Sequence, residues 1–139
     1  MFKTIDLFAG AGGITEGFRK AGYECVCAND FDEEAKHTFT YNHPTVPFVL
    51  KDVREVTANE LLSEANCLSS DIDVITGGPP CQGFSLAGQR LSDDHRNTLF
   101  REYIRIAKDI QPKVIFFENV YGIMNMQFIS SPTLNSPQV

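Results

Sequence analysis

The sequence predicts a doubly wound α/β fold around a mostly parallel β-sheet. Short strand-like apolar runs alternate with helix-length runs of apolar periodicity, and a glycine-rich turn, Gly10–Gly13, separates the first strand from the first helix. Residue types that bind ligands or carry out chemistry follow each strand-like run. Because alternating strands and helices form right-handed βαβ units, the strands should be parallel and should all end at one edge of the sheet.

The first part of the chain supplies three strands and two helices. Each strand is a short apolar run, and each helix repeats apolar residues every three or four positions, as Ile14, Phe18 and Ala21 do in the first helix. The expected elements, in order, are strand Lys3–Phe8, helix Ile14–Ala21, strand Glu24–Asn29, a helix over about 32–41, and strand Phe48–Leu50.

The second part supplies two more helices and two more strands. Thr57 is a suitable N-cap for a helix, and Glu60 stands three residues later, as in a capping box. Pro112 ends an amphipathic helix and precedes a run of continuous apolar character, as parallel strands have. The expected elements are a helix near Ala58–Cys67, strand Asp73–Thr76, a helix marked by Leu99, Tyr103, Ile106, Ala107 and Ile110, and strand Val114–Phe117.

Composition restricts the class of protein. The 139 residues carry a net charge of −6, which by itself disfavours nucleic-acid binding, so a DNA-binding role would need a local basic site or a basic partner. No apolar run reaches the roughly 20 residues of a membrane span, and the first residues lack the features of a signal peptide, which predicts a cytoplasmic protein. Cys25 and Cys27 should share one face of a strand as core thiols, and no Cys/His spacing predicts a metal site.

The glycine turn would let a ligand approach the N-terminus of the first helix. Its spacing is G-x-G-G, which differs from the G-x-G-x-x-G of dinucleotide enzymes, and it lacks the lysine of a phosphate-binding loop. Such a turn can also serve only to pack a helix against a sheet. Asp30, about 20 residues later, would accept hydrogen bonds from both hydroxyls of a ribose. The alternative is that Asp30 caps the helix that follows.

Two further residues at strand ends suit an adenine ring. Phe31, beside Asp30, would offer an apolar face to the ring, or would simply pack in the core. Asp52, after the third strand, would accept from the adenine amino group, or would be an ordinary loop residue.

The stretch Gly77–Ser85, which reads GGPPCQGFS, is the most informative in the chain. Two prolines stiffen the backbone before Cys81, and the surrounding glycines leave room for a large ligand, so the thiol should be exposed and reactive rather than structural. The loop that follows is long enough for a lid or binding loop, and Arg90 and Arg96 would grip phosphates there, or would be ordinary solvated arginines. A role for His95 as the base of Cys81 is disfavoured because no third group orients it.

Glu118 and Asn119 close the fifth strand, beside the end of the fourth. A carboxylate at the end of a buried strand is costly unless it pairs or works, so we expect Glu118 to be buried, to hold a proton and to donate it to a ring nitrogen near Cys81. Asn119 would fix the geometry of this pair.

These motifs, in this order and at these spacings, resemble the DNA (cytosine-5) methyltransferase family. Asp6–Gly13, DLFAGAGG, is similar to the family's cofactor-loop motif, Gly78–Gln82, GPPCQ, to its catalytic Pro-Cys motif, and Glu118–Val120 to its Glu-Asn-Val motif. Arg96–Phe100 resembles the segment between the last two, although Asn97 stands where glycine is usual.

The resemblance implies a Rossmann-like fold of the S-adenosylmethionine-dependent methyltransferase kind, incomplete in this chain. It implies that Cys81 attacks carbon 6 of a cytosine flipped out of double-stranded DNA, that Glu118 donates to ring nitrogen 3, and that Asn119 assists them. The pocket for S-adenosylmethionine, released as S-adenosylhomocysteine, would comprise Phe8, Ala9, Gly10, Gly12, Gly13, Asp30, Phe31, Asp52, Val53, Pro80 and Leu99. DNA contacts would come from Gln82, Ser85, Arg90 and Arg96.

The resemblance covers residues 1–126, which we expect to be the N-terminal part of a methyltransferase catalytic domain. The uncharged stretch 127–139 should be a frayed or foreign tail. In the family, more strands, an arginine-bearing catalytic motif, a target-recognition domain and a closing helix follow, and none fits in the 19 residues from Tyr121 onward. The chain would then be an expression fragment, one piece of a split enzyme completed by a second chain, or a truncated remnant. We expect activity only when the missing C-terminal half completes the enzyme, and we expect it in the cytoplasm, at the nucleoid in a bacterium.

Two other functions remain open at this point. One is a non-catalytic cofactor-binding module or pseudo-enzyme that acts through a partner chain. The other is a nicotinamide oxidoreductase, which the G-x-G-G spacing disfavours and which leaves Cys81 and Glu118 without a role.

Overall fold

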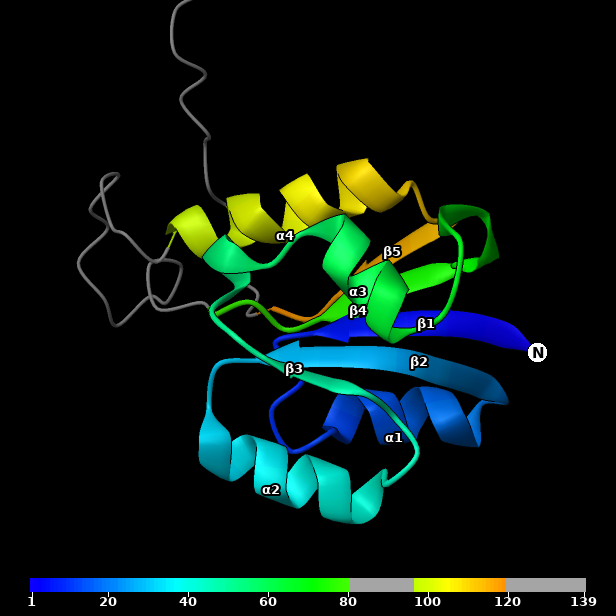
Figure 1. The fold of residues 1–139 in the computed structure, drawn as a ribbon, viewed down its shortest axis with the longest axis vertical. Helices are drawn as coiled ribbons and strands as arrows, with labels where there is room; N and C mark the ends of the chain where they lie inside the picture. The colour runs from blue at the N-terminus through cyan, green and yellow to red at the C-terminus, as the bar shows by residue number, and fades with distance from the viewer. Residues whose placement is uncertain (81–96, 120–139) are drawn as a thin grey trace, which may run out of the picture.

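A parallel β-sheet organises residues 1–80 and 97–119, the part of the chain that the computed structural model describes. Its five strands lie in the order β3-β2-β1-β4-β5, and every neighbouring pair is parallel (Figure 1). The strands are β1 Phe2–Leu7, β2 Tyr23–Asp30, β3 Phe48–Leu50, β4 Val74–Gly77 and β5 Val114–Phe117. The predicted doubly wound α/β fold and all five strands are therefore confirmed.

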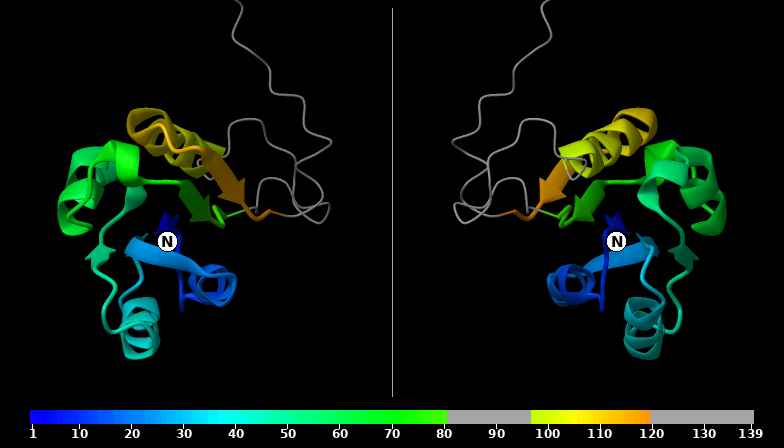
Figure 2. Two further views of the ribbon diagram at one scale, coloured as in Figure 1. Left: turned by 90° about the vertical axis from the view of Figure 1, so that its right-hand side faces the viewer. Right: turned by 90° about the vertical axis from the view of Figure 1, so that its left-hand side faces the viewer.

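Helices cover both faces of this sheet (Figures 1 and 2). The helices α1, Gly13–Lys20, and α2, Glu33–Asn42, lie on one face, and α3, Ala58–Glu64, and α4, Asn97–Ile110, lie on the other. Two short 3₁₀ turns, η1 over Val53–Glu55 and η2 over Ser69–Asp71, were not predicted. Within the described part of the chain, no helix has both the length and the apolar character that crossing a membrane requires.

The main core lies between the sheet and the pair α3 and α4. Its fully buried members include Ile5 and Leu7 of β1, Ile75 of β4, and Tyr103 of α4. The Tyr103 hydroxyl lies 2.9 Å from the Ile75 carbonyl oxygen and 3.0 Å from that of Phe116, so its single hydrogen is shared between two strands. This contact fixes α4 over the carboxyl ends of β4 and β5.

Thr57 caps α3 as predicted, because its hydroxyl accepts from the Glu60 amide at 3.2 Å. The reciprocal half of the capping box is absent, since the Glu60 carboxylate accepts from Lys51 Nζ at 2.8 Å instead. The helix ends at Glu64, earlier than predicted, because Asn66 adopts a left-handed conformation with φ 49°.

Cys25 and Cys27 do not share a face of β2, contrary to the prediction. The pairing register with β1 shifts, so that Thr4 opposes Cys25 and Ile5 opposes Cys27, which leaves one extra residue between them. Cys25 consequently lies beside Thr15 of α1, whereas Cys27 is in the core under α3 and α4. Burial raises the pKa of the two thiols to about 11 and about 12, respectively.

Candidate functional site

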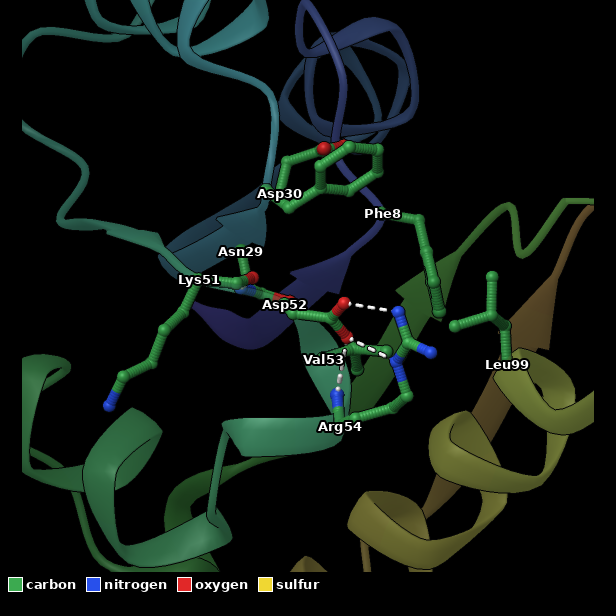
Figure 3. Close-up of a pocket in the computed structure, with 9 residues that line it drawn as sticks. Phe8, Asn29, Asp30, Lys51, Asp52, Val53, Arg54 and Leu99 are labelled. Atoms are coloured by element: carbon green, nitrogen blue, oxygen red, sulfur yellow. Dashed lines mark hydrogen bonds and ion pairs between the residues drawn. The ribbon is translucent and has the colours of Figure 1, made fainter.

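The carboxyl ends of the parallel strands border a cavity of about 150 Å³ (Figure 3). Its walls come from the ends of β1, β2 and β3, from η1 and from the start of α4. The lining residues are Phe8, Asn29, Asp30, Phe31, Lys51, Asp52, Val53, Arg54 and Leu99. Six of these were predicted from the sequence as cofactor-binding residues.

The glycine turn wraps tightly around the end of β1. Phe8, predicted as the last strand residue, instead takes a left-handed conformation with φ 57°, and Gly10 and Gly12 follow with φ 53° and 94°. Its neighbour Ala9 is buried against Ala28 and Phe39, so the methyl group packs the turn rather than lining the cavity. The turn therefore presents mainly backbone toward the sheet edge.

Asp30 ties this turn to β2. The Gly10 amide donates to Asp30 Oδ2 at 2.9 Å, and the Asp32 amide donates to Oδ1 at 3.1 Å. The alternative that Asp30 caps α2 is wrong, because Asp32 is the N-cap and accepts from Glu34 and Ala35. Since each carboxylate oxygen has two acceptor positions, Asp30 keeps one on each oxygen for a ligand.

Phe31 is 70% exposed although it lines the cavity, so the alternative of simple core packing is wrong. Phe8 and Leu99 are half-buried, and both pack against the main core at the inner side of the cavity (Figure 3). An exposed phenyl ring beside a partly apolar cavity can cover the face of a planar ligand.

Asp52 forms a forked ion pair with Arg54 at the rim. Arg54 Nε lies 2.9 Å from Asp52 Oδ1, and Nη2 lies 2.5 Å from Oδ2, while the Arg54 amide also donates to Oδ1 at 2.9 Å. The side-chain hydrogen bonds from Arg54 lower the pKa of Asp52, so this carboxylate is ionised near neutral pH. Arg54, which sequence reasoning missed, thus keeps Asp52 an acceptor.

Asn29 and Asp6 hold the cavity walls from below. The side-chain nitrogen of Asn29, Nδ2, donates to the Val49 and Lys51 carbonyl oxygens, both at 2.9 Å, which fixes the end of β3. Asp6 accepts hydrogen bonds from the hydroxyls of Thr15 and Thr76, which link α1 and β4 to β1, and burial raises the pKa of Asp6. Neither role was predicted; the available signal was a polar residue inside an otherwise buried strand.

The ends of β4 and β5 form a second part of the site. The Glu118 amide donates to the Gly77 carbonyl oxygen at 2.9 Å, and Asn119 Nδ2 donates to the Pro79 carbonyl oxygen at 3.3 Å. A Cβ placed on Gly78 would lie 3.4 Å from Glu118 Oε2, so the carboxylate lies against Gly78.

The expectation that Glu118 is buried was wrong, because its side chain is exposed. Within the described residues β5 is an edge strand, and Val114, Ile115 and Phe116 are 54%, 46% and 45% exposed. Burial therefore gives no reason to expect a protonated Glu118. What still supports a role for Glu118 is its position beside Gly77 and Gly78, directly before Pro79 and Pro80.

The remaining predicted site residues fall into two groups. Gly13 begins α1 beside Gly12, and Pro80 is half-buried after β4, away from the cavity lining. The predicted nucleophile and DNA contacts, Cys81, Gln82, Ser85, Arg90 and Arg96, lie outside the described residues, as does His95. Residues 1–80 and 97–119 contain no group of three or more His, Cys, Asp or Glu side chains suited to a metal ion.

Comparisons with known proteins agree with this geometry. Residues 2–133 match the family model described as C-5 cytosine-specific DNA methylase. The type II methyltransferase M.AgeI of Thalassovita gelatinovora is 42% identical over 124 residues, which are 89% of this chain and 29% of that protein. M.XorII of Xanthomonas oryzae pv. oryzae is 46% identical over 119 residues, which are 86% of this chain and 28% of that protein.

A solved structure of a DNA modification methyltransferase encoded within an E. coli prophage superposes with a TM-score of 0.75 at 37% identity. The match covers 89% of this chain and 33% of that one. The chain thus spans about a third or less of the length of these similar proteins.

Proposed function

The chain belongs to the C-5 cytosine-specific DNA methylase family, and we propose that it supplies the cofactor pocket and the nucleophile for methylating carbon 5 of cytosine in DNA. Because it spans only 28–29% of the two curated relatives, the proposed activity is that of the chain completed by a C-terminal half. Duplex DNA is the proposed partner, and the proposed site of action is the cytoplasm, at the nucleoid in a bacterium.

The observation that carries this proposal is the meeting of Phe31, Asp30 and Asp52 at one cavity. These residues suit the parts of S-adenosylmethionine: the phenyl ring for the adenine face, the Asp30 oxygens for the ribose hydroxyls, and Asp52 for the adenine amino group. The cavity of about 150 Å³ is smaller than the roughly 300–1,000 Å³ of a complete small-molecule site. It would therefore take the base, with the rest of the cofactor extending toward Gly10 and Gly12.

The residues at the ends of β4 and β5 would act on the cytosine. The Cys81 thiolate would add to carbon 6 while Glu118 donates a proton to ring nitrogen 3, which stabilises the charge that develops on the ring. S-adenosylmethionine, when bound, supplies the methyl group that carbon 5 then takes. Loss of the proton from carbon 5 would restore the double bond and expel the Cys81 thiolate. Asn119, through its bond to Pro79, would keep the cysteine loop in register with Glu118.

DNA contacts would come from the loop that carries Cys81. Gln82 and Ser85 would contact the flipped nucleotide, and Arg90 and Arg96 would bind phosphates. The net charge of −6 implies that most of the basic DNA-binding surface belongs to the C-terminal half. That charge also favours the second candidate, a cofactor-binding module without catalysis that acts through a partner chain.

Calorimetry with S-adenosylhomocysteine tests the pocket in the 139-residue chain. Stacking of a base on an aromatic side chain is worth about 1–3 kcal/mol, so Phe31→Ala should weaken binding about 5- to 150-fold. Phe2→Ala is a matched control, since Phe2 is also exposed, at 59%, but lies at the end of β1 that is far from the cavity. Equal losses in the two variants would remove Phe31 from the site.

A covalent trap separates the catalytic function from the second candidate. Supplied with a C-terminal half from a relative, the chain should form an adduct with DNA that contains 5-fluorocytosine, because fluorine at carbon 5 cannot leave as a proton does. Cys81→Ser should abolish the adduct, since a serine hydroxyl stays protonated near pH 7. Adducts that persist in Cys81→Ser would refute the mechanism, and cofactor binding without any adduct would favour the non-catalytic module.

A further inference from the structure

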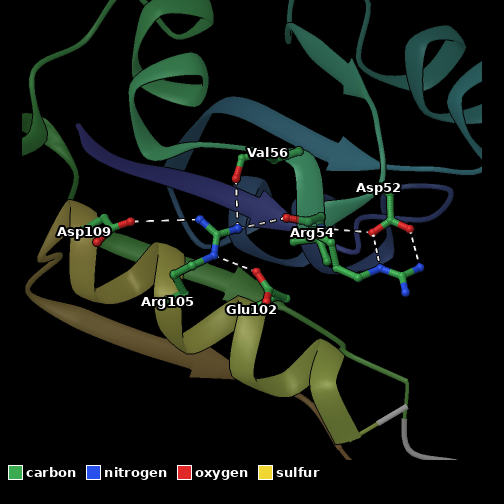
Figure 4. A network of polar contacts seen from close by, with 7 residues as sticks. Asp52, Arg54, Val56, Glu102, Arg105 and Asp109 are labelled. Atoms are coloured by element: carbon green, nitrogen blue, oxygen red, sulfur yellow. Dashed lines mark hydrogen bonds and ion pairs between the residues drawn. The ribbon is translucent and has the colours of Figure 1, made fainter. Parts of the chain in front are cut away.

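Arg105 of α4 reaches across to the 3₁₀ turn η1 (Figure 4). Its Nη2 donates to the Val53 carbonyl oxygen at 3.0 Å and to the Val56 carbonyl oxygen at 2.9 Å. On its own helix, Nε donates to Glu102 Oε2 at 2.6 Å, and Nη1 lies 4.0 Å from Asp109 Oδ2. The guanidinium is therefore held from one side by carboxylates and clamps two backbone carbonyls on the other.

These carbonyls belong to a short turn with few backbone hydrogen bonds of its own. The turn η1 contains three residues, and its own backbone bond from the Val56 amide to the Val53 oxygen is long, at 3.3 Å. The Val53 and Val56 side chains are 4% and 1% exposed, so the segment lies in the core, where a carbonyl that loses its partner is costly. Arg105 thus gives the Val56 carbonyl oxygen a charged donor and adds a second donor to the long bond at the Val53 carbonyl oxygen.

The same segment forms one wall of the cavity. Asp52, Val53 and Arg54 all line it, and Leu99 lines it from α4, the helix that carries Arg105. We propose that Arg105 is a positioning residue that locks the η1 wall against α4 and thereby sets the affinity and the base selectivity of cofactor binding. This inference rests on the proposed S-adenosylmethionine pocket.

Base selectivity follows from the hydrogen bonds of Asp52. A carboxylate has about four acceptor positions, and Arg54 occupies two on Oδ1 and one on Oδ2. The remaining position on Oδ2 accepts an N–H, such as the 6-amino group of adenine, but repels the 6-carbonyl oxygen of hypoxanthine. This distinction depends on where η1 holds Asp52, and so on Arg105.

The test compares S-adenosylhomocysteine with S-inosylhomocysteine, in which a carbonyl replaces the 6-amino group. Calorimetry on the wild-type chain should show a preference of about tenfold or more for the adenosyl compound, the value of one hydrogen bond to a charged group. Arg105→Gln should bind S-adenosylhomocysteine about tenfold more weakly, and its preference should fall below about threefold. Arg101→Gln on the same helix, where Arg101 has no hydrogen bond or ion pair among the described residues, should keep both values.

Two further variants cover the case in which Arg105→Gln does not fold. Arg105→Lys retains a cationic donor for one carbonyl and should keep part of the wild-type preference. Glu102→Gln keeps an acceptor for Arg105 Nε but removes its charge, so it should lower the preference less than Arg105→Lys does. A variant of Arg105 that binds both compounds more weakly but keeps the full preference would overturn the proposal, since a general loss of stability acts on both alike.

Hydrogen exchange keeps the inference separate from the proposed function. If the wild-type chain binds neither compound, the proposed function fails, and exchange of the Glu55 and Val56 amides without ligand still tests the clamp. These amides bond to the Asp52 and Val53 carbonyl oxygens, and they should exchange faster in Arg105→Gln than in Arg101→Gln. Equal exchange in the two variants would overturn the inference.

Discussion

Alanine at Gly12 should destabilise the fold much more than alanine at Gly10. Gly12 has φ 94°, and a Cβ there would lie 2.7 Å from His43 Nε2, 2.8 Å from His43 Cδ2 and 3.0 Å from Phe39 Cδ2. A left-handed conformation costs an L-residue about 1–2 kcal/mol, and overpacking costs about 1–3 kcal/mol, which gives about 2–5 kcal/mol for Gly12→Ala. Gly10 has φ 53° but no atom within 4 Å of its Cβ position, so only the backbone cost of about 1–2 kcal/mol applies.

The imidazole cannot move away from the new methyl group at low cost. His43 is 7% exposed, and its ring centroid lies 4.9 Å from that of the fully buried Phe39. Urea denaturation should therefore place the midpoints in the order wild type, Gly10→Ala, Gly12→Ala with unchanged slopes. Adding His43→Ala to Gly12→Ala should recover part of the loss, because the two changes share one contact. Equal destabilisation at the two glycines would refute the assigned packing of the turn.

Three other outcomes are expected. Asp30→Ala should weaken S-adenosylhomocysteine binding by about 1–3 kcal/mol in calorimetry, because charge-assisted hydrogen bonds are lost; unchanged affinity would remove Asp30 from the site. Cys25 and Cys27, whose pKa values burial raises to about 11 and about 12, should resist iodoacetamide at pH 8 in the native chain, and mass spectrometry that finds them alkylated before unfolding would contradict this. The Lys113 ammonium lowers the pKa of Asp73, so this pair should add stability that is complete above about pH 4 and lost as pH falls through the lowered value. Lys113→Met should accordingly be less stable than wild type at pH 7, and the difference should shrink as the pH falls through the lowered pKa of Asp73; a difference independent of pH would exclude the pair as its cause.

Local patterns predicted the strands because each is a short apolar run between turn residues. Strand ends differed by at most one residue, as at Phe8, whose left-handed conformation ends β1 early. The extra residue in β2 could not be predicted, since it depends on pairing with β1, and it turned Cys25 and Cys27 toward opposite faces. The exposure of Glu118 does not follow from the sequence, since the apolar run of β5 indicates a buried strand although β5 lies at the edge of the described sheet.

The candidate site also divides into residues whose position the local sequence predicts and residues whose position depends on distant parts of the chain. The position of Asp30 and Phe31 at the cavity was predictable, because a parallel sheet brings strand ends to one edge whatever the details of packing. Arg105 was not, since the carbonyl oxygen of Val53 to which it donates stands 52 residues earlier in the chain. Nothing in the amphipathic pattern of α4 distinguishes Arg105 from Arg101 until the turn η1 is in place.

Polar side chains hold the elements around the cavity in a way that apolar packing cannot. Apolar contacts are non-directional, so a strand end or a turn could shift by a fraction of a residue at little cost in buried area. Asp6, Asn29 and Arg105 each bond to a different neighbouring element at a defined atom, and a shift would leave a buried polar group without its partner. These three residues fix, respectively, the helix below the glycine turn, the end of β3 and the η1 wall. The proposed ligand-binding residues can then stand at the rim, Asp30 and Asp52 half-buried and Phe31 exposed, because their positions are set from beneath.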